Sequence, residues 1–192
     1  MAESPLNEAV RGKNVEVIWM PFELRPYPTP TLRPEGSYLQ QAWRNAVYPL
    51  AERMGVPIRL PAVSPQPYTR LAFEGLEFAK DHGAADEYNS GVMRAFFQRS
   101  EDIGDPEVLT RIASESGLQP DAFRSALDQR TYADRVAQLL RQANEELQVT
   151  GVPLFVIGNQ RLSGVQSKAA LESAIDRHLR AQGAENQPAP LY

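Results

Sequence analysis

Cysteine is absent from the 192 residues of this chain, and histidine occurs only twice. Without cysteine the chain can form no disulfide bond, no thiolate nucleophile and no cysteine-ligated metal centre. The two histidines, His82 and His178, are far apart and have no carboxylate at ligand spacing, so no metal site is expected. Glycine-rich phosphate loops and the G-x-S-x-G motif are also missing. We therefore expect neither a metal nor another cofactor.

Basic charge and long apolar runs are scarce as well. The formal net charge is -4, so no surplus of Lys and Arg exists to neutralise phosphates, and we expect no nucleic-acid partner. No apolar run approaches membrane-spanning length, and residues 1–5 lack the basic and apolar regions of a secretory signal. We expect a cytoplasmic protein without a membrane partner. Its length fits one domain with an insertion.

The stretch after Pro153 is the best-marked element. Residues 154–158 are apolar or Gly without alternation, which predicts a short strand buried on both faces. Asn159 and Gln160 are predicted to form a turn, and residues 161–164 the second strand of a hairpin. A helix is predicted from Ser167, with Gly183 just beyond its end. The apolar stripe of that helix consists of Leu171, Ala174, Ile175, His178 and Leu179.

The N-terminal part predicts a helix over residues 4–12 and then a strand from Asn14 to Met20, rich in Val, Ile and Trp. Residues 21–26 follow with the sequence PFELRP. The middle of the chain predicts mostly helices, one of them starting at the N-cap Asp105 with Pro106 behind it. The predicted helical segments are 39–54 with a break near Pro49, 68–82, 88–99, 105–117, 120–127 and 132–147. His82 falls at a helix end, where it is expected to contact the terminal carbonyls.

Several of these segments carry a family resemblance when they are taken together and in order. They are NVEVIWM running into PFEL, the helical segments LAFEGLEFAKDHG and EYNSGVMRAFFQRSEDIGDPEVL, and GVPLFVIG followed by RLSGVQ and a terminal helix. The chain resembles the DsbA family of thioredoxin-like proteins, in the FrnE-like cytoplasmic branch. The resemblance implies an α/β thioredoxin-like fold with a large all-helical insertion. The implied boundaries are 1–26 and 148–183 for the thioredoxin-like domain, 27–147 for the insertion and 184–192 for a flexible tail.

The activity that the resemblance implies is thiol–disulfide exchange on protein or peptide thiols and disulfides. In this family a cis-proline opens the strand that faces a C-x-x-C motif, which implies a cis bond between Val152 and Pro153. The implied substrate-binding residues are Thr150, Gly151, Val152 and Pro153, whose backbone would pair with an extended substrate. The two cysteines have no counterpart here, so no catalytic residue is assigned, and the chain as written is expected to be inactive.

The resemblance implies a C-x-x-C motif, whereas the chain contains no cysteine. The family's first strand and C-x-x-C would lie before Met1, so we expect an N-terminally incomplete version of a longer protein, through a misplaced start or a truncated gene. A degenerate relative that fills the gap with another segment is the alternative. Two other functions stay open: a glutathione-dependent isomerase or transferase resembling hydroxychromene carboxylate isomerase and kappa glutathione transferases, and a non-enzymatic peptide-binding domain. Homodimerisation is also left open.

Overall fold

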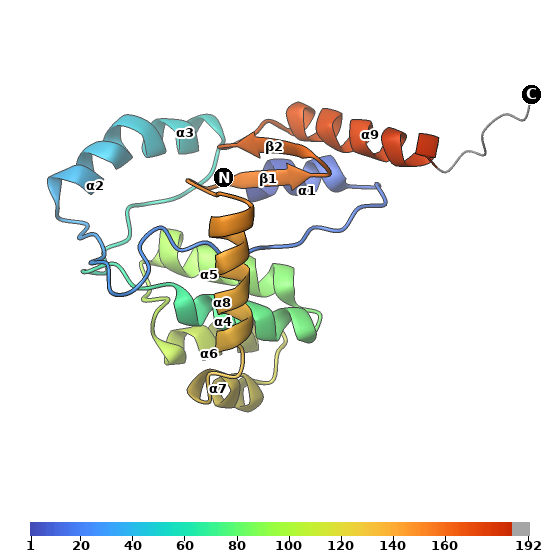
Figure 1. Cartoon of the computed structure of the whole chain (residues 1–192). Coiled ribbons are helices and arrows are strands. Elements are labelled where there is room, and N and C mark those ends of the chain that lie inside the picture. The colour runs from blue at the N-terminus through green and yellow to red at the C-terminus, as the bar shows by residue number, and fades with distance from the viewer. Residues whose placement is uncertain (186–192) are drawn as a thin grey trace, which may run out of the picture. The chain divides into compact units, whose positions relative to one another are not determined.

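The structure, a computed structural model, describes residues 1–185 (Figure 1). The chain divides into two compact units, one made of Met1–Ile18 with the residues from Val149 onward, and one of Trp19–Gln148. Residues 19–26, which were predicted to be part of the thioredoxin-like domain, lie in the second unit. Of the tail predicted at 184–192, residues 184 and 185 continue the last helix, and 186–192 lie outside the described residues.

In the described part of the chain, the first unit contains two helices and one β-hairpin. Its elements are α1 (Glu3–Val10), β1 (Leu154–Ile157), β2 (Gln160–Ser163) and α9 (Lys168–Glu185). α1 and α9 pack on each other, and α9 also contacts β1. The apolar centre is small, and its buried members are Leu6, Ala9, Leu171, Ala174 and Ile175. An ion pair between Lys13 and Asp176 joins the chain just after α1 to α9.

The hairpin confirms the predicted strand after Pro153 but corrects its details. β1 and β2 are antiparallel, with Leu154 opposite Ser163 and Ile157 opposite Gln160. The turn is therefore made by Gly158 and Asn159, one residue earlier than predicted. Gly158 has a φ of 58°, which suits the first position of a type II′ turn. The strand is not buried on both faces, because Val156 remains 47% exposed.

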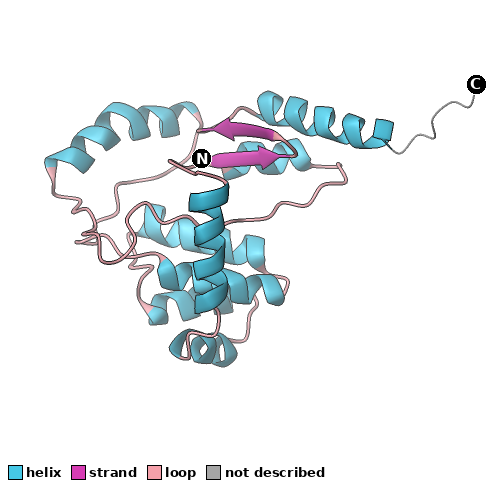
Figure 2. Cartoon of the chain, in the orientation of Figure 1, coloured by secondary structure: helices cyan, strands magenta, loops and turns pink. Residues whose placement is uncertain are grey.

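The strand predicted from Asn14 to Met20 does not form. Side-chain exposure still alternates along this segment, with Val15 and Val17 half-buried and Glu16 and Ile18 exposed, as in an extended chain. A strand, however, is stabilised by its cross-strand neighbours. The described residues contain only one sheet, the two-stranded β1–β2 sheet, so this segment has no strand to pair with (Figure 2).

The second unit is helical, as predicted for the middle of the chain. Its helices are α2 (Ser37–Ala42), α3 (Tyr48–Arg53), α4 (Arg70–Asp81), α5 (Ala85–Arg99), α6 (Pro106–Glu115), α7 (Pro120–Asp128) and α8 (Ala133–Arg141). π-Helical turns at Trp43–Val47 and Gln142–Glu146 follow α2 and α8. The core lies between α4 and its neighbours, and Leu109, Ile112 and Phe123 are completely buried in it.

The break predicted near Pro49 takes an unexpected form. Pro49 lies in the first turn of α3, where its missing N–H is tolerated, and the preceding turn from Trp43 to Val47 widens into a π-helix. Leu39 and Trp43 are buried as the predicted stripe requires, whereas Ala46 is exposed. The extra residue of the π-helical turn rotates Ala46 out of the stripe.

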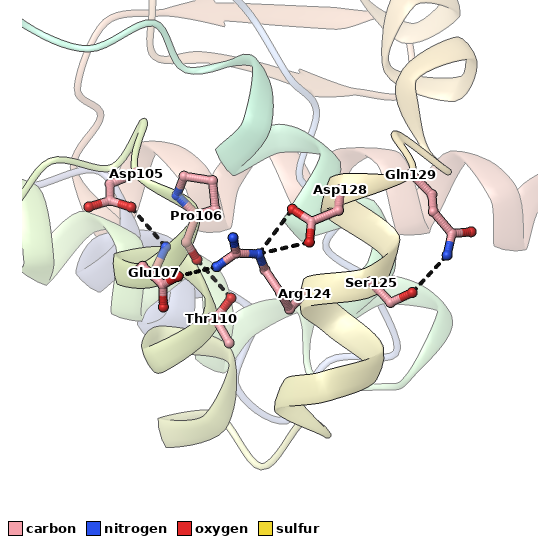
Figure 3. Close-up of polar contacts among 8 residues, drawn as sticks. All are labelled: Asp105, Pro106, Glu107, Thr110, Arg124, Ser125, Asp128 and Gln129. Carbon is pink, nitrogen blue, oxygen red and sulfur yellow. Dashed lines mark hydrogen bonds and ion pairs between the residues drawn. The ribbon is translucent and has the colours of Figure 1, made fainter.

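The start of α6 follows the sequence prediction closely. The carboxylate of Asp105 accepts a hydrogen bond from the backbone N–H of Glu107 at 2.9 Å, and Pro106 occupies the first helical position. Figure 3 shows this cap beside the side chain of Arg124, which comes from α7 and forms ion pairs with Glu107 and Asp128. None of the helices among residues 1–185 has the length and apolarity needed to cross a membrane.

Candidate functional site

The four predicted substrate-binding residues form the segment that enters β1. Thr150, Gly151 and Val152 are exposed, and Pro153 is half-buried. The side chain of Val152 is 51% exposed, and the peptide bond between Val152 and Pro153 is cis. This segment therefore presents backbone and one apolar side chain to solvent at the start of a strand.

The backbone of β1 has one edge without a partner strand. The carbonyl of Pro153 accepts a hydrogen bond from the N–H of Gly164 at 2.8 Å, so the ladder to β2 extends one residue beyond β1. Successive residues of a strand direct their N–H and C=O groups to opposite edges. Phe155 therefore bonds toward β2, while Leu154 and Val156 direct their groups toward the other edge. Since the sheet of the described residues has two strands, that edge, called the open edge below, has no partner strand.

The two faces of the hairpin differ in what they contact. Gln160 lies opposite Ile157, and residues directly opposite each other share a face. The side chain of Gln160 contacts α9, so this face is directed to α9. Val156 and its opposite residue Arg161 lie on the other face. The open edge is thus bordered by an apolar, half-exposed Val156.

The turn of the hairpin is attached to α9 by three neighbouring contacts. An ideal methyl group placed on Gly158 would lie 2.3 Å from Nδ1 of His178, which shows that the imidazole ring rests against the glycine. Arg177 donates a hydrogen bond to Oε1 of Gln160 at 2.7 Å. The amide of Gln160 also reaches the carbonyl of Ala174, at 3.5 Å.

Sequence reasoning missed this attachment. It placed His178 on the inward stripe as a packing residue, which its half-buried position confirms, but it gave no role to Gly158 or Arg177. The pair Gly158-Asn159 is a recognisable two-residue hairpin turn, and it could have identified the correct register. The contact with Arg177 depends on packing, for which the sequence carries no local signal.

The electrostatics of the segment are simple, because none of the residues from Thr150 to Pro153 has a titratable side chain. The marked pKa shifts lie in the second unit. A hydrogen bond from Arg135 lowers the pKa of Asp81, and burial raises the pKa of Tyr88. His82 ends α4, stacks on Phe78 and places Nδ1 2.8 Å from the carbonyl of Phe78, as expected for a helix end. Within residues 1–185, no group of three potential ligands could hold a metal ion.

A known domain family and a curated bacterial protein both match most of this chain. The family model of the DSBA-like thioredoxin domain matches residues 1–176. The YwbO protein of Bacillus subtilis is 47% identical over 176 residues, which cover 91% of this chain and 88% of that protein.

Two solved structures share the fold at low sequence identity. A probable DsbA oxidoreductase from Streptomyces coelicolor has a TM-score of 0.74 at 22% identity. The match covers 100% of this chain and 87% of the chain of that structure. A 2-hydroxychromene-2-carboxylate isomerase has a TM-score of 0.61 at 22% identity. The match covers 79% of this chain and 70% of the chain of that structure. The predicted α/β thioredoxin-like fold with a helical insertion is confirmed. With the family model spanning residues 1–176, the chain belongs to the DSBA-like thioredoxin domain family.

Proposed function

We propose that this chain is the peptide-docking part of a thiol–disulfide oxidoreductase of the FrnE-like branch. The observation that carries the proposal is the exposed segment Thr150–Pro153, which leads into β1. An extended peptide can pair with the exposed backbone of such a segment by hydrogen bonds, which give affinity without requiring a particular side-chain sequence. That property suits an enzyme acting on disulfides in many different proteins.

The redox step needs sulfur that this chain does not contain. In thiol–disulfide exchange a thiolate attacks one sulfur of a disulfide, a mixed disulfide forms, and the other sulfur leaves as a thiolate. Because the chain has no cysteine, the attacking thiolate has to come from polypeptide outside these 192 residues. In this proposal the residues from Thr150 to Val152 hold the substrate peptide, while Pro153 packs against the sulfurs and, lacking an N–H, offers no donor that could bind an anion there.

A titration of the ¹⁵N-labelled chain followed by NMR tests the docking part directly. The probe is a terminally blocked octapeptide with a central S-methylcysteine, which can form strand-like hydrogen bonds but cannot exchange disulfides. We expect its addition to shift the amide signals of Val152 and Leu154. The matched control is the same peptide with N-methylated backbone amides, which cannot donate to a strand edge. Equal shifts with both peptides, or none with either, would contradict the proposal.

The redox part is tested at the level of the gene. In-frame codons upstream of Met1 that encode C-x-x-C would support an oxidoreductase, and a version of the chain extended by them should reduce insulin disulfides. A serine-containing motif there would instead support the glutathione-dependent isomerase or transferase. Absence of either motif would leave a peptide-binding domain without redox chemistry. A cytoplasmic location remains a prediction, and cell fractionation checks it.

A further inference from the structure

The hairpin that carries the proposed docking segment depends on support from outside its own sheet. An isolated two-stranded hairpin is marginally stable in water. Among the described residues, the β1–β2 sheet has no third strand, and Val156 on one face is half-exposed. The position of β1 is therefore set largely by what holds the other face, which is α9.

The contacts with α9 are concentrated at the turn. The ring of His178 fills the space beside Gly158 so closely that even a methyl group would overlap it. One residue earlier in α9, Arg177 donates to the side chain of Gln160, the first residue of β2. Both contacts lie next to Ile157 and Gln160, the pair that closes the hairpin.

The hydrogen-bonded ladder between β1 and β2 connects the turn to Pro153. β1 contains four residues, so the turn and Pro153 lie at the two ends of one short strand. The last bond of the ladder joins the N–H of Gly164 to the carbonyl of Pro153. That carbonyl belongs to the docking segment itself, so movement at the turn alters the backbone that a peptide would meet.

We propose that α9 positions the docking segment through a positioning cluster, which consists of Gly158, Gln160, Arg177 and His178. This inference rests on the proposed function, because it concerns the affinity of the same segment for an extended peptide. The four residues are proposed to act without touching the peptide, by fixing β1 and with it the carbonyl of Pro153.

The first test removes the exposed arginine. In Arg177→Ala the hydrogen exchange of the Gly164 amide should accelerate by about twofold to tenfold, the range expected from the loss of one hydrogen bond. Binding of the S-methylcysteine octapeptide should weaken by a similar factor. Arg177→Lys restores a donor to Gln160 and should restore both values. Arg180→Ala, which removes an exposed arginine of the same helix bonded only to its own helix, is the control.

The second test uses two glycines with similar backbones. Gly158 and Gly12 both have positive φ, 58° and 74°, but an added methyl group at Gly12 meets no atom within 4 Å. Alanine therefore introduces backbone strain at both positions and a clash with His178 only at Gly158. Gly158→Ala should accelerate exchange at Gly164 by a further factor of at least ten relative to Gly12→Ala, since overpacking adds its cost to the strain.

The outcomes separate the two proposals. Equal effects of Arg177→Ala and Arg180→Ala, or equal effects of the two glycine substitutions, would overturn the positioning cluster. Failure of the unsubstituted chain to bind the octapeptide would overturn the proposed function alone, because the exchange of the Gly164 amide decides the cluster without any peptide. Rescue by Arg177→Lys together with a parallel change in peptide affinity is the expected result.

Discussion

Replacing Tyr88 by phenylalanine should stabilise the helical unit. Tyr88 in α5 is 1% exposed, and its hydroxyl has no hydrogen-bond partner among the described residues. The hydroxyl rests against Gly75 of α4, where an added methyl group would lie 2.2 Å away. A buried hydroxyl without a partner costs about 1–3 kcal/mol, whereas the ring retains its contact with Phe123 after the change.

The expected gain from Tyr88→Phe is about 1–2 kcal/mol, since removal of the oxygen leaves a small void that offsets part of it. For a domain of this size that corresponds to a rise of roughly 2–8 °C in Tm. Both tryptophans of the chain, Trp19 and Trp43, belong to the helical unit, so their fluorescence follows its unfolding.

Tyr132→Phe is the matched control for this prediction. The hydroxyl of Tyr132 donates to Asp81 at 2.9 Å, so the same chemical change should destabilise the unit by about 0.5–1.5 kcal/mol. A loss of stability in Tyr88→Phe as large as that in Tyr132→Phe would refute the reasoning, because it would mean that the buried hydroxyl has a partner.

Three further predictions concern the same unit. Arg130→Ala should lower its free energy of unfolding in urea by about 2–3 kcal/mol, because Glu74, which is 1% exposed, loses both of its hydrogen bonds to the guanidinium. Glu74→Gln keeps the size of the side chain but removes its charge, so its loss of stability should be smaller. Asp105→Ala should cost about 1 kcal/mol through loss of the N-cap of α6, and Asp105→Asn should recover most of it. The pKa of Asp81 is lowered mainly by the hydrogen bond from Arg135. The stabilising effect of this carboxylate is therefore present above the pKa that Asp81 has in the unfolded chain, and it is lost as the pH falls through the pKa of the folded state. Asp81→Asn should reduce the acid sensitivity of the urea unfolding midpoint.

The helices could be predicted well because their signals are local. Asp105 followed by Pro106 is a complete helix start, and the structure has α6 beginning at Pro106. The predicted end of the last helix before Gly183 was wrong, since α9 continues to Glu185. One glycine lowers helix stability by only about 1 kcal/mol, which is too little to end a long helix by itself.

The β-structure could be predicted less well because pairing is non-local. Residues 14–18 have the composition and the alternation of a strand, but these properties do not supply a neighbour. At the candidate site, the family motifs predict Thr150–Pro153 as substrate-binding residues, and this stays a prediction. The sequence could not identify Arg177, because nothing in the neighbourhood of an exposed arginine on a helix indicates which glutamine it will meet.

The division of the chain into a continuous and a discontinuous unit has a consequence for synthesis. The helical unit is encoded in one stretch and can begin to fold as it leaves the ribosome, whereas Met1–Ile18 must wait for the residues from Val149 onward. At about 5–20 residues per second, translation takes on the order of ten seconds to pass from Ile18 to Val149. During that interval α1 has no α9 to cover Leu6 and Ala9, and the nascent chain emerges with this apolar stripe available to chaperones.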